Sequence, residues 1–567
     1  MLKRFLPFLL LAACTTPSSP PPRTASTSLV GMVSAADPRA VEAGREMLRA
    51  GGSATDAAIA TAIALTVVEP QSSGIGGGGF LVHHAVKATG GGGTLTSYDG
   101  REKAPSAATP AWFLGADGKP IARPSTGGRA VGVPGNIRMF AAAHRANGKL
   151  PWARLFQPAI RLARDGYALS PRGRTSMLAR PDTLALTAWA RATYLQDGQP
   201  KPVGSIIRNP ELATLFERIA TRGPDWFYTG TPAANIVAAV NGASVNPAPM
   251  RAGDLASYDA KAREVPCGTY RGYRICGMGP PSSGATTVFA VLKQLERFDL
   301  RALGPDSPEA WHLIAESMRL AYADREAYLA DPAYFTVPVQ GLMNASYLAD
   351  RSTLIARDRA AAKVVAGTPP GAMLTASVPD GEVAGTSHIV AADAAGNVAT
   401  MTSTIEAIWG SGVTVDGIFL NNEMTDFGIV PARADGLPMP NRVEGGKRPR
   451  SSMAPTIVYA PDGSVRLALG AAGGPTIIMQ VAKAIIGVID WGKTAQEAIA
   501  LPTITVAGDG IAVERGTALE AMVPALTARG HRVQVRDPSF KANAIERIGN
   551  RWVGAADPRS EGVALSQ

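Results

Sequence analysis

The sequence predicts an α+β protein, in which antiparallel strands and long helices are distributed over 567 residues. Residues 381–427 contain the clearest pair of strands, and residues 36–70 and 306–331 carry the clearest helical signals. With 46% hydrophobic residues, the chain can bury a large core, either as one big domain or as two closely associated ones. The net charge of +10 is spread over this length without basic runs that alternate with aromatic residues, which argues against nucleic-acid binding.

Residues 1–13 are predicted to be a signal peptide. A short basic start is followed by an apolar stretch, Phe5–Leu11, which is too short to span a bilayer. The next residues, Leu11 to Cys14, resemble the lipobox of bacterial lipoproteins. We therefore expect Cys14 to be lipidated and the protein to be periplasmic, anchored in the outer membrane because no aspartate follows the cysteine. An uncleaved anchor or a plain signal peptide is the alternative.

A tether is predicted next, at residues 14–28, because this Pro/Ser/Thr-rich stretch cannot bury a core. The first helix begins at Pro38 with Asp37 as its cap, and Gly51 and Gly52 end it. A second helix, at 56–68, is apolar on all sides and is expected to be buried.

A glycine-rich run follows the second helix. Gly74, Gly76 and Gly79 have the spacing of a dinucleotide-binding motif, but that motif precedes a helix. Here residues 80–86 are predicted to be a strand. We expect these glycines to allow close backbone packing beside a site.

The middle of the chain offers few chemical signals. Arg101 ends a predicted strand and could bind a carboxylate with both ends of its guanidinium, although a solvated or paired arginine is commoner. Residues 134–230 are predicted to be mostly helical, and the amphipathic helix at 306–331 is expected to be structural.

Cys267 and Cys276 bracket a predicted hairpin. In an oxidising compartment a disulfide between them is favoured over two free thiols. Neither cysteine has further potential metal ligands close to it in the sequence. The adjacent pair His83 and His84 would point to opposite faces of a strand, so they cannot share a metal ion. We expect no metal site.

The most informative stretch is a second hairpin. Residues 388–392 and 398–405 are rich in β-branched and apolar side chains, and residues 393–397 between them have turn composition. Alternation in the second strand places four polar side chains on one face: Thr400, Thr402, Thr404 and Glu406. Antiparallel counting sets Thr386 opposite roughly position 405, to within about two residues.

This geometry suggests that Thr386 is an N-terminal nucleophile. A threonine hydroxyl needs a base, and the free α-amino group of the same residue can serve if the chain is cut between Gly385 and Thr386. Residues 356–385 have little pattern, as an exposed segment before a cleavage point would have. An ordinary polar-faced hairpin is the alternative.

Three features after the hairpin complete the predicted site. Residues 428–446 form a polar loop long enough to act as a lid, and Ser451 and Ser452 follow as twin hydroxyls. Gly473 and Gly474 come directly before a predicted helix at 476–489, where their backbone N–H groups could form an oxyanion hole. An ordinary strand–helix turn is the alternative there.

Together these motifs resemble the γ-glutamyltransferase (γ-glutamyltranspeptidase) family of N-terminal nucleophile hydrolases. The resemblance covers about residues 29–565 and includes Thr386 with the Ser and His that follow it. Its other motifs are GGSATDAAIA, VEPQSSGIGGGGF, REKAP, PPSSG, LNNEMTDF, KRPRSSMAPTIV, GAAGG and the late ADPR.

The resemblance implies a four-layer αββα sandwich built from two autoprocessed subunits, residues 29–385 and 386–567. Thr386 would attack the carbonyl of Gly385, split the precursor and then act as the catalytic nucleophile. Thr404 would orient it, and Gly473 and Gly474 would form the oxyanion hole.

The resemblance also implies how substrate is held. Three residues, Arg101, Ser451 and Ser452, would bind the α-carboxylate of a γ-glutamyl donor. Three acids, Glu406, Glu423 and Asp426, would bind its α-ammonium. The family's usual donor is glutathione, its acceptors are water, amino acids or peptides, and no cofactor is required.

The sequence departs from the family pattern at several positions. Many members carry Asn at the position of Glu406 and Gln at that of Glu423, and Pro475 stands where Ser or Thr is usual. The predicted lid has no tyrosine.

Two alternative functions stay open: an acylase that removes glutaryl-type groups, and a non-catalytic lipoprotein that binds solutes. Intact Thr386 and Thr404 argue against the second.

Overall fold

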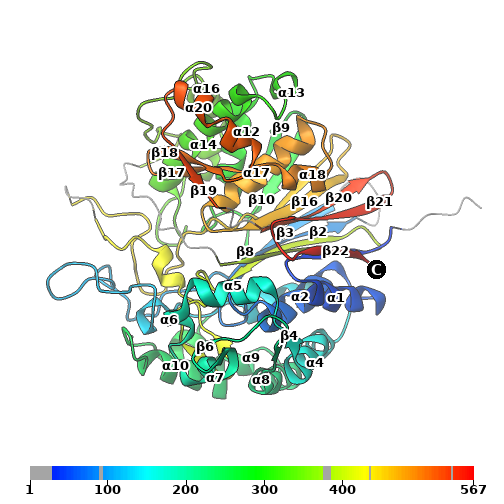
Figure 1. Cartoon of the computed structure of the whole chain (residues 1–567), viewed down its shortest axis with the longest axis vertical. Helices are drawn as coiled ribbons and strands as arrows, with labels where there is room; N and C mark the ends of the chain where they lie inside the picture. The colour runs from blue at the N-terminus through cyan, green and yellow to red at the C-terminus, as the bar shows by residue number, and fades with distance from the viewer. Residues whose placement is uncertain (1–28, 88–92, 374–384, 433–435, 538–540) are drawn as a thin grey trace, which may run out of the picture.

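Four layers make up the molecule in the computed structural model, which describes residues 29–87, 93–373, 385–432, 436–537 and 541–567. Two stacked antiparallel sheets lie in the middle, with helices above and below them (Figure 1). The predicted α+β class and its αββα arrangement are confirmed. Cys14, the signal peptide and the tether lie outside the described residues.

The first sheet contains the predicted nucleophile hairpin at its centre. Its strands, in spatial order, are β22 (Val563–Ser566), β1 (Met32–Ala35), β11 (Ser387–Ala392), β12 (Val398–Thr404), β2 (Gly78–Val86), β3 (Gly93–Asp99) and β8 (Lys261–Arg263). All neighbouring strands in it are antiparallel.

The second sheet packs on the first through β11 and β12. Its strands, in spatial order, are β21 (Arg551–Ala556), β20 (Lys541–Ile548), β16 (Val465–Ala472), β15 (Thr456–Tyr459), β10 (Tyr273–Gly277) and β9 (Cys267–Tyr270). In β9 and β10 Cys267 lies opposite Cys276, and the two form the predicted disulfide.

Helices cover both outer faces (Figure 1). One side has α1 (Pro38–Arg49) and α2 (Ala54–Val68); the other has α12 (Gly284–Leu295), α14 (Pro308–Tyr328) and α17 (Thr476–Ile489). Further helices of eight or more residues are α3 (Asn136–Asn147), α4 (Gln157–Asp165), α5 (Pro171–Ala179), α8 (Pro210–Arg222), α10 (Thr231–Asn241) and α16 (Ala345–Ser352). In the described part of the chain, no helix is both long and apolar enough to cross a membrane.

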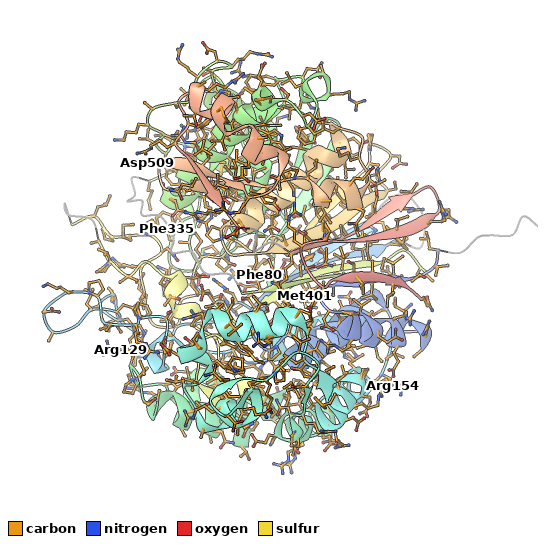
Figure 2. All side chains as sticks on the ribbon, in the orientation of Figure 1. Phe80, Arg129, Arg154, Phe335, Met401 and Asp509 are labelled. Carbon is orange, nitrogen blue, oxygen red and sulfur yellow. A yellow bond between two sulfur atoms is a disulfide. The ribbon has the colours of Figure 1, made fainter. Side chains whose placement is uncertain are left out.

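The first sheet is buried on both faces, which gives the molecule two apolar cores. In β11, Ile389 faces the helices α1 and α2, whereas Val390 faces the second sheet. In the same way, Met401 on β12 faces the helices α1 and α2, whereas Phe80 on β2 faces the second sheet. Both side chains lie deep between the layers (Figure 2). Burial on both faces explains the apolar run at residues 389–392 of β11, whereas β12 alternates apolar residues with buried hydroxyls.

The register of the nucleophile hairpin agrees with the predicted one. Ser387 pairs with Ser403, so Thr386 lies one step beyond the paired residues, beside Thr404. Asp393 N–H donates to Asn397 C=O at 3.0 Å and closes the turn. The turn composition therefore determined which side chains meet at the open end of the hairpin.

The glycine-rich run packs its backbone directly on the end of this hairpin and on Phe419, in agreement with the close packing expected for it. A Cβ atom at Gly77 would lie 2.0 Å from the carbonyl oxygen of Thr404, and one at Gly76 would lie 2.1 Å from that of Phe419. No side chain fits in either space, because both neighbours are backbone atoms.

We predict that Gly77→Ala destabilises the protein by more than about 3 kcal/mol, because the new Cβ would displace the end of β12. Gly253→Ala is the matched control, since Gly253 lies in a short helix with nothing within 4 Å of the added atom. Denaturant unfolding of both variants measures the difference. Equal stability of the two variants would contradict the close packing of Gly77.

Candidate active site

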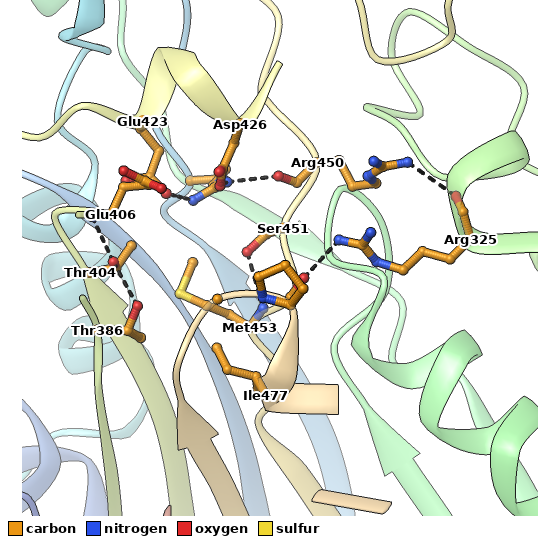
Figure 3. Close-up of a pocket in the computed structure, with 14 residues that line it drawn as sticks. Arg325, Thr386, Thr404, Glu406, Glu423, Asp426, Arg450, Ser451, Met453 and Ile477 are labelled. Atoms are coloured by element: carbon orange, nitrogen blue, oxygen red, sulfur yellow. Dashed lines mark hydrogen bonds and ion pairs between the residues drawn. The ribbon is translucent and has the colours of Figure 1, made fainter. Parts of the chain in front are cut away.

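A pocket lies where β11 begins and where β12 and β16 end (Figure 3). It brings together residues that are up to several hundred positions apart in the chain. The predicted site residues that line it are Arg101, Thr386, Thr404, Glu406, Glu423, Asp426, Ser451, Ser452 and Gly474. Gly473 directly precedes the last of these, in the turn between β16 and α17.

Thr386 is held at both its hydroxyl and its backbone. Its Oγ1 lies 2.9 Å from Oγ1 of Thr404, and its N–H donates to the carbonyl oxygen of Ser72 at 2.8 Å. Thr404 Oγ1 also accepts a hydrogen bond from the N–H of Glu406 at 2.7 Å. Thr404 can therefore donate its one proton to Thr386 Oγ1, which leaves the Thr386 proton available to a base.

The backbone at the predicted cleavage point is strained. Thr386 has φ of 113°, a value that β-branched residues rarely adopt. Glu406, across the hairpin end, has φ of 74°. A Cβ atom at Gly385 would lie 2.2 Å from the carbonyl oxygen of Glu406, so only glycine fits immediately before Thr386.

The glycine pair turns the chain from β16 into α17. Gly473 has φ of 130° and Gly474 has φ of 59°, conformations that favour glycine. The N–H groups of this turn lie at the positive end of a helix of 14 residues. Pro475 follows as the N-cap, and its carbonyl oxygen accepts a hydrogen bond from the hydroxyl of Tyr322.

Arg101 is fully buried and lies between the acids. Its guanidinium forms ion pairs with Glu423 and, at 2.5 Å, with Asp426. It also donates to the carbonyl oxygens of Pro449 at 3.1 Å and Arg450 at 2.8 Å. The side chain predicted to bind a carboxylate, Arg101, thus already contacts two of the three acids predicted to bind an ammonium.

Burial changes the protonation of these acids. It raises the pKa of Glu406 and that of Glu423 well above their ordinary values, and the neighbouring carboxylates raise both further, whereas Arg101 opposes the shift of Glu423. Burial likewise raises the pKa of Glu102 to about 8. In the described part of the chain neither Glu102 oxygen accepts a hydrogen bond, and the nearest cation, Arg101 Nη1, is 3.6 Å away.

The two serines are held by different partners. Ser451 Oγ accepts from the N–H of Met453 at 3.2 Å, and the backbone of Ser451 is bound by Ser283, whose N–H and Oγ both donate to its carbonyl oxygen at 2.8 Å. Ser452 Oγ accepts from the guanidinium of Arg325 at 2.7 Å. These contacts attach the serine segment to the start of α12.

Two arginines in the pocket were not predicted. Arg325 comes from α14, the helix that was expected to be only structural, and Arg450 directly precedes the serine pair. Glu326 lies between them and forms an ion pair with each, at 2.5 and 2.7 Å. No local pattern distinguishes Arg325 from other helical arginines, so its role depends on tertiary contacts.

His388 contributes packing inside the sheets. It lies between the hydroxyls of Thr402 and Thr400, at 2.9 and 3.1 Å, and burial lowers its pKa to about 3. The imidazole is therefore neutral at physiological pH. Within the described ranges, no group of three or more His, Cys, Asp or Glu side chains could hold a metal ion.

A sequence model of the family described as gamma-glutamyltranspeptidase matches residues 40–566. The chain belongs to this family. The predicted family is therefore confirmed. Among its relatives is the glutathione hydrolase proenzyme of Bacillus subtilis strain 168, which is 36% identical over 550 residues, or 94% of this chain and 91% of that protein.

Relatives with acylase names match the chain equally well. The acylase ACY 1 proenzyme of Pseudomonas sp. strain SE83 is 35% identical over 550 residues, or 94% of this chain and 93% of that protein. Among solved structures, the cephalosporin acylase from Bacillus halodurans has a TM-score of 0.83 at 27% identity and covers 98% of this chain and 99% of that one. Proteins with either name share this fold, so the choice between the two activities has to be made from the residues of the pocket.

We predict that Glu102→Gln stabilises the protein at alkaline pH. The folded pKa of about 8 lies above the ordinary value of 4.5, so stability is lost as pH rises through this interval, and the neutral amide removes that loss. Thermal midpoints at pH 5 and pH 9 test this. The advantage of the variant should be greater at pH 9.

The control for that comparison is Asp509→Asn, because the side chain of Asp509 is 83% exposed. It should change neither midpoint appreciably. An advantage of Glu102→Gln that is the same at both pH values would show that Glu102 does not titrate in this range.

Proposed function

We propose that this protein is a γ-glutamyltransferase and glutathione hydrolase with Thr386 as its nucleophile. The observation that carries the proposal is the 2.9 Å contact between the hydroxyls of Thr386 and Thr404 in a pocket that also contains Arg101 and three acids. The relatives named glutathione hydrolase proenzymes support both the activity and synthesis as a precursor.

Maturation begins with Thr386. Its Oγ1 attacks the carbonyl carbon of Gly385, the C–N bond breaks, and the acyl group moves to oxygen as an ester. Water then hydrolyses this ester and leaves a carboxylate on Gly385 and a free amine on Thr386. The products are a large subunit that ends at Gly385 and a small one, residues 386–567, and the strain at Thr386 favours the cut.

The same hydroxyl then acts on substrate. The new α-amine of Thr386 takes the proton of Oγ1, which attacks the γ-carbonyl carbon of the donor. The N–H groups of Gly473 and Gly474 stabilise the oxyanion. The amine returns its proton to the leaving amine, and an acyl-enzyme remains. Water or an amino-acid or peptide amine attacks this ester, again with the Thr386 amine as base.

Charge in the pocket complements a zwitterion. Arg101 and Asp426 form a pair of opposite charges, and a γ-glutamyl donor carries a carboxylate and an ammonium on one carbon. We assign the carboxylate to Arg101 with Ser451 and Ser452, and the ammonium to Asp426 with Glu406 and Glu423. When the donor binds, each ion of the protein pair gains a partner of opposite charge.

The pocket favours this function over that of an acylase. A glutaryl group has the same chain length but lacks the α-ammonium, so its carboxylate would compete with Glu423 and Asp426 for Arg101 without bringing a cation in return. Weakening these buried ion pairs without compensation costs free energy, and this cost selects against such donors.

We also propose that the mature enzyme is periplasmic and is anchored to the outer membrane through a lipid on Cys14. The basic and apolar start of the chain and its lipobox-like residues support this. The disulfide between Cys267 and Cys276 fits an oxidising compartment.

We predict that γ-glutamyl-p-nitroanilide is cleaved with a kcat/KM more than about 100-fold that of glutaryl-p-nitroanilide. Asp426→Asn should lower kcat/KM for the γ-glutamyl compound by about 10-fold or more and should leave the glutaryl compound almost unaffected, because only the first carries the ammonium. Release of p-nitroaniline measures both rates. A preference for the glutaryl compound in the wild type would establish the acylase instead.

A further inference from the structure

A buried lysine lies directly behind the nucleophile, on the side away from the pocket. Lys541 Nζ donates to Glu69 Oε2 at 2.8 Å, to Ser72 Oγ at 3.1 Å and to Ser387 Oγ at 3.2 Å. Ser387 Oγ in turn donates to Glu69 Oε2 at 2.7 Å. All four side chains are buried, so the cluster is closed to solvent.

Two of the partners of Lys541, Ser72 and Ser387, and Lys541 itself are each one step from a group that acts in the proposed reaction. Ser387 directly follows Thr386, and the carbonyl oxygen of Ser72 accepts the N–H of Thr386 at 2.8 Å. Lys541 itself, on β20, pairs with Ala472 on β16, the residue immediately before Gly473. One ammonium therefore connects the nucleophile strand, the glycine-rich loop and the strand that leads to the oxyanion turn.

We propose that Lys541, paired with Glu69, is a positioning residue that aligns Thr386 with the oxyanion turn across the two sheets and keeps the α-amine of Thr386 neutral. The inference rests on the proposed function, in which that amine is the base. Lys541 belongs to the small subunit and Glu69 to the large one, so the pair would also connect the subunits after cleavage.

A purely structural role does not account for this pair. Two charges withdrawn from water carry a desolvation cost that apolar side chains of similar size would not. Burial lowers the pKa of Lys541 to about 8, although Glu69 opposes this shift. Although burial alone would raise it, the pKa of Glu69 is lowered because Lys541 and Arg172 favour its charged form. Both groups are thus charged near neutral pH.

The charge of Lys541 acts on the amine through a short connection. After cleavage, the amine of Thr386 would lie against the Ser72 carbonyl oxygen, and the hydroxyl of the same serine binds Lys541. A nearby cation disfavours the protonated form of an amine and so lowers its pKa. Glu69 acts in the opposite direction. The neutral amine, which is the form able to take a proton, would persist to lower pH because Lys541 is present.

Other charges face Thr386 from the pocket and from the cluster. On the pocket side these are Glu406, Glu423, Asp426, Arg101, Arg325 and Arg450; behind the nucleophile they are Glu69, Lys541, Arg172 and Asp37. Substitution of one cluster residue leaves the pocket charges in place. A change in the pH dependence of kcat therefore reports on the cluster.

The test compares Lys541→Met with Lys483→Met in the full chain. Lys483 is an equally buried lysine, but it donates to the carbonyl oxygens of Ile499 and Leu501 and to Thr503, away from the pocket. Self-cleavage is followed by intact mass, and kcat and KM are measured with γ-glutamyl-p-nitroanilide from pH 5 to pH 10.

For Lys541→Met we expect kcat to fall by about 10-fold or more, while KM stays within about twofold of the wild-type value. We also expect the acidic limb of the pH profile of kcat to move to higher pH by roughly half to one unit. Glu69→Gln should move that limb down, because the lysine charge is no longer balanced. Lys483→Met should lower the thermal midpoint without moving the limb. Lys541→Arg keeps the charge and should keep the limb near its wild-type position.

Two results would overturn the inference. In one, Lys541→Met and Lys483→Met have the same kcat and the same acidic limb. In the other, Lys541→Met and Glu69→Gln move the limb in the same direction. If Lys541→Met does not fold, the acidic limbs measured for Glu69→Gln and Lys541→Arg test the proposal. It requires the limb of Glu69→Gln to move to lower pH and that of Lys541→Arg to stay in place. A wild-type chain that neither splits nor releases p-nitroaniline would instead refute the proposed function.

Discussion

The antiparallel register between β11 and β12 is the constraint on which the site depends. Because Ser387 pairs with Ser403, the hydroxyls of Thr386 and Thr404 meet at 2.9 Å just beyond the last paired residues. A slip of one residue would turn one of them to the other face of the sheet. The register is fixed locally by the turn at Asp393 and globally by burial of both faces of the sheet, so the chemistry of the pocket relies on the packing of the core.

The charged side chains of the pocket surround the open end of this hairpin. Without a ligand, these side chains do not fully compensate one another's charge. Arg101 faces Glu423 and Asp426, and burial favours the protonated forms of Glu406 and Glu423. Such a cluster is a poor way to stabilise a fold, because desolvation offsets most of the attraction between the ions. It is well suited to a ligand that brings one negative and one positive group, and this is why we favour a γ-glutamyl donor over a glutaryl one.

The parts of this account that follow from local patterns were predictable from the sequence. The hairpin, the cap at Asp37, the disulfide and the contact of Thr386 with Thr404 all depend on residues that are close in the chain or paired by composition. Side-chain directions over long separations were not predictable. The sequence placed Arg101 among the substrate-binding residues but gave no sign that two acids more than 300 positions later would bind it. Arg325 and Lys541 carry no local signal, because each is defined only by what tertiary packing brings to it.

The central claim is that Thr386 cuts the chain and then becomes its catalytic residue. The most direct test is the intact mass of the purified protein, made without residues 1–28, as wild type, Thr386→Ser and Thr386→Ala. We expect that wild type and Thr386→Ser, which retain a hydroxyl, give two masses that meet between Gly385 and Thr386, whereas Thr386→Ala stays whole. A wild-type chain that remains in one piece, or a Thr386→Ala chain that splits at the same bond, would contradict it.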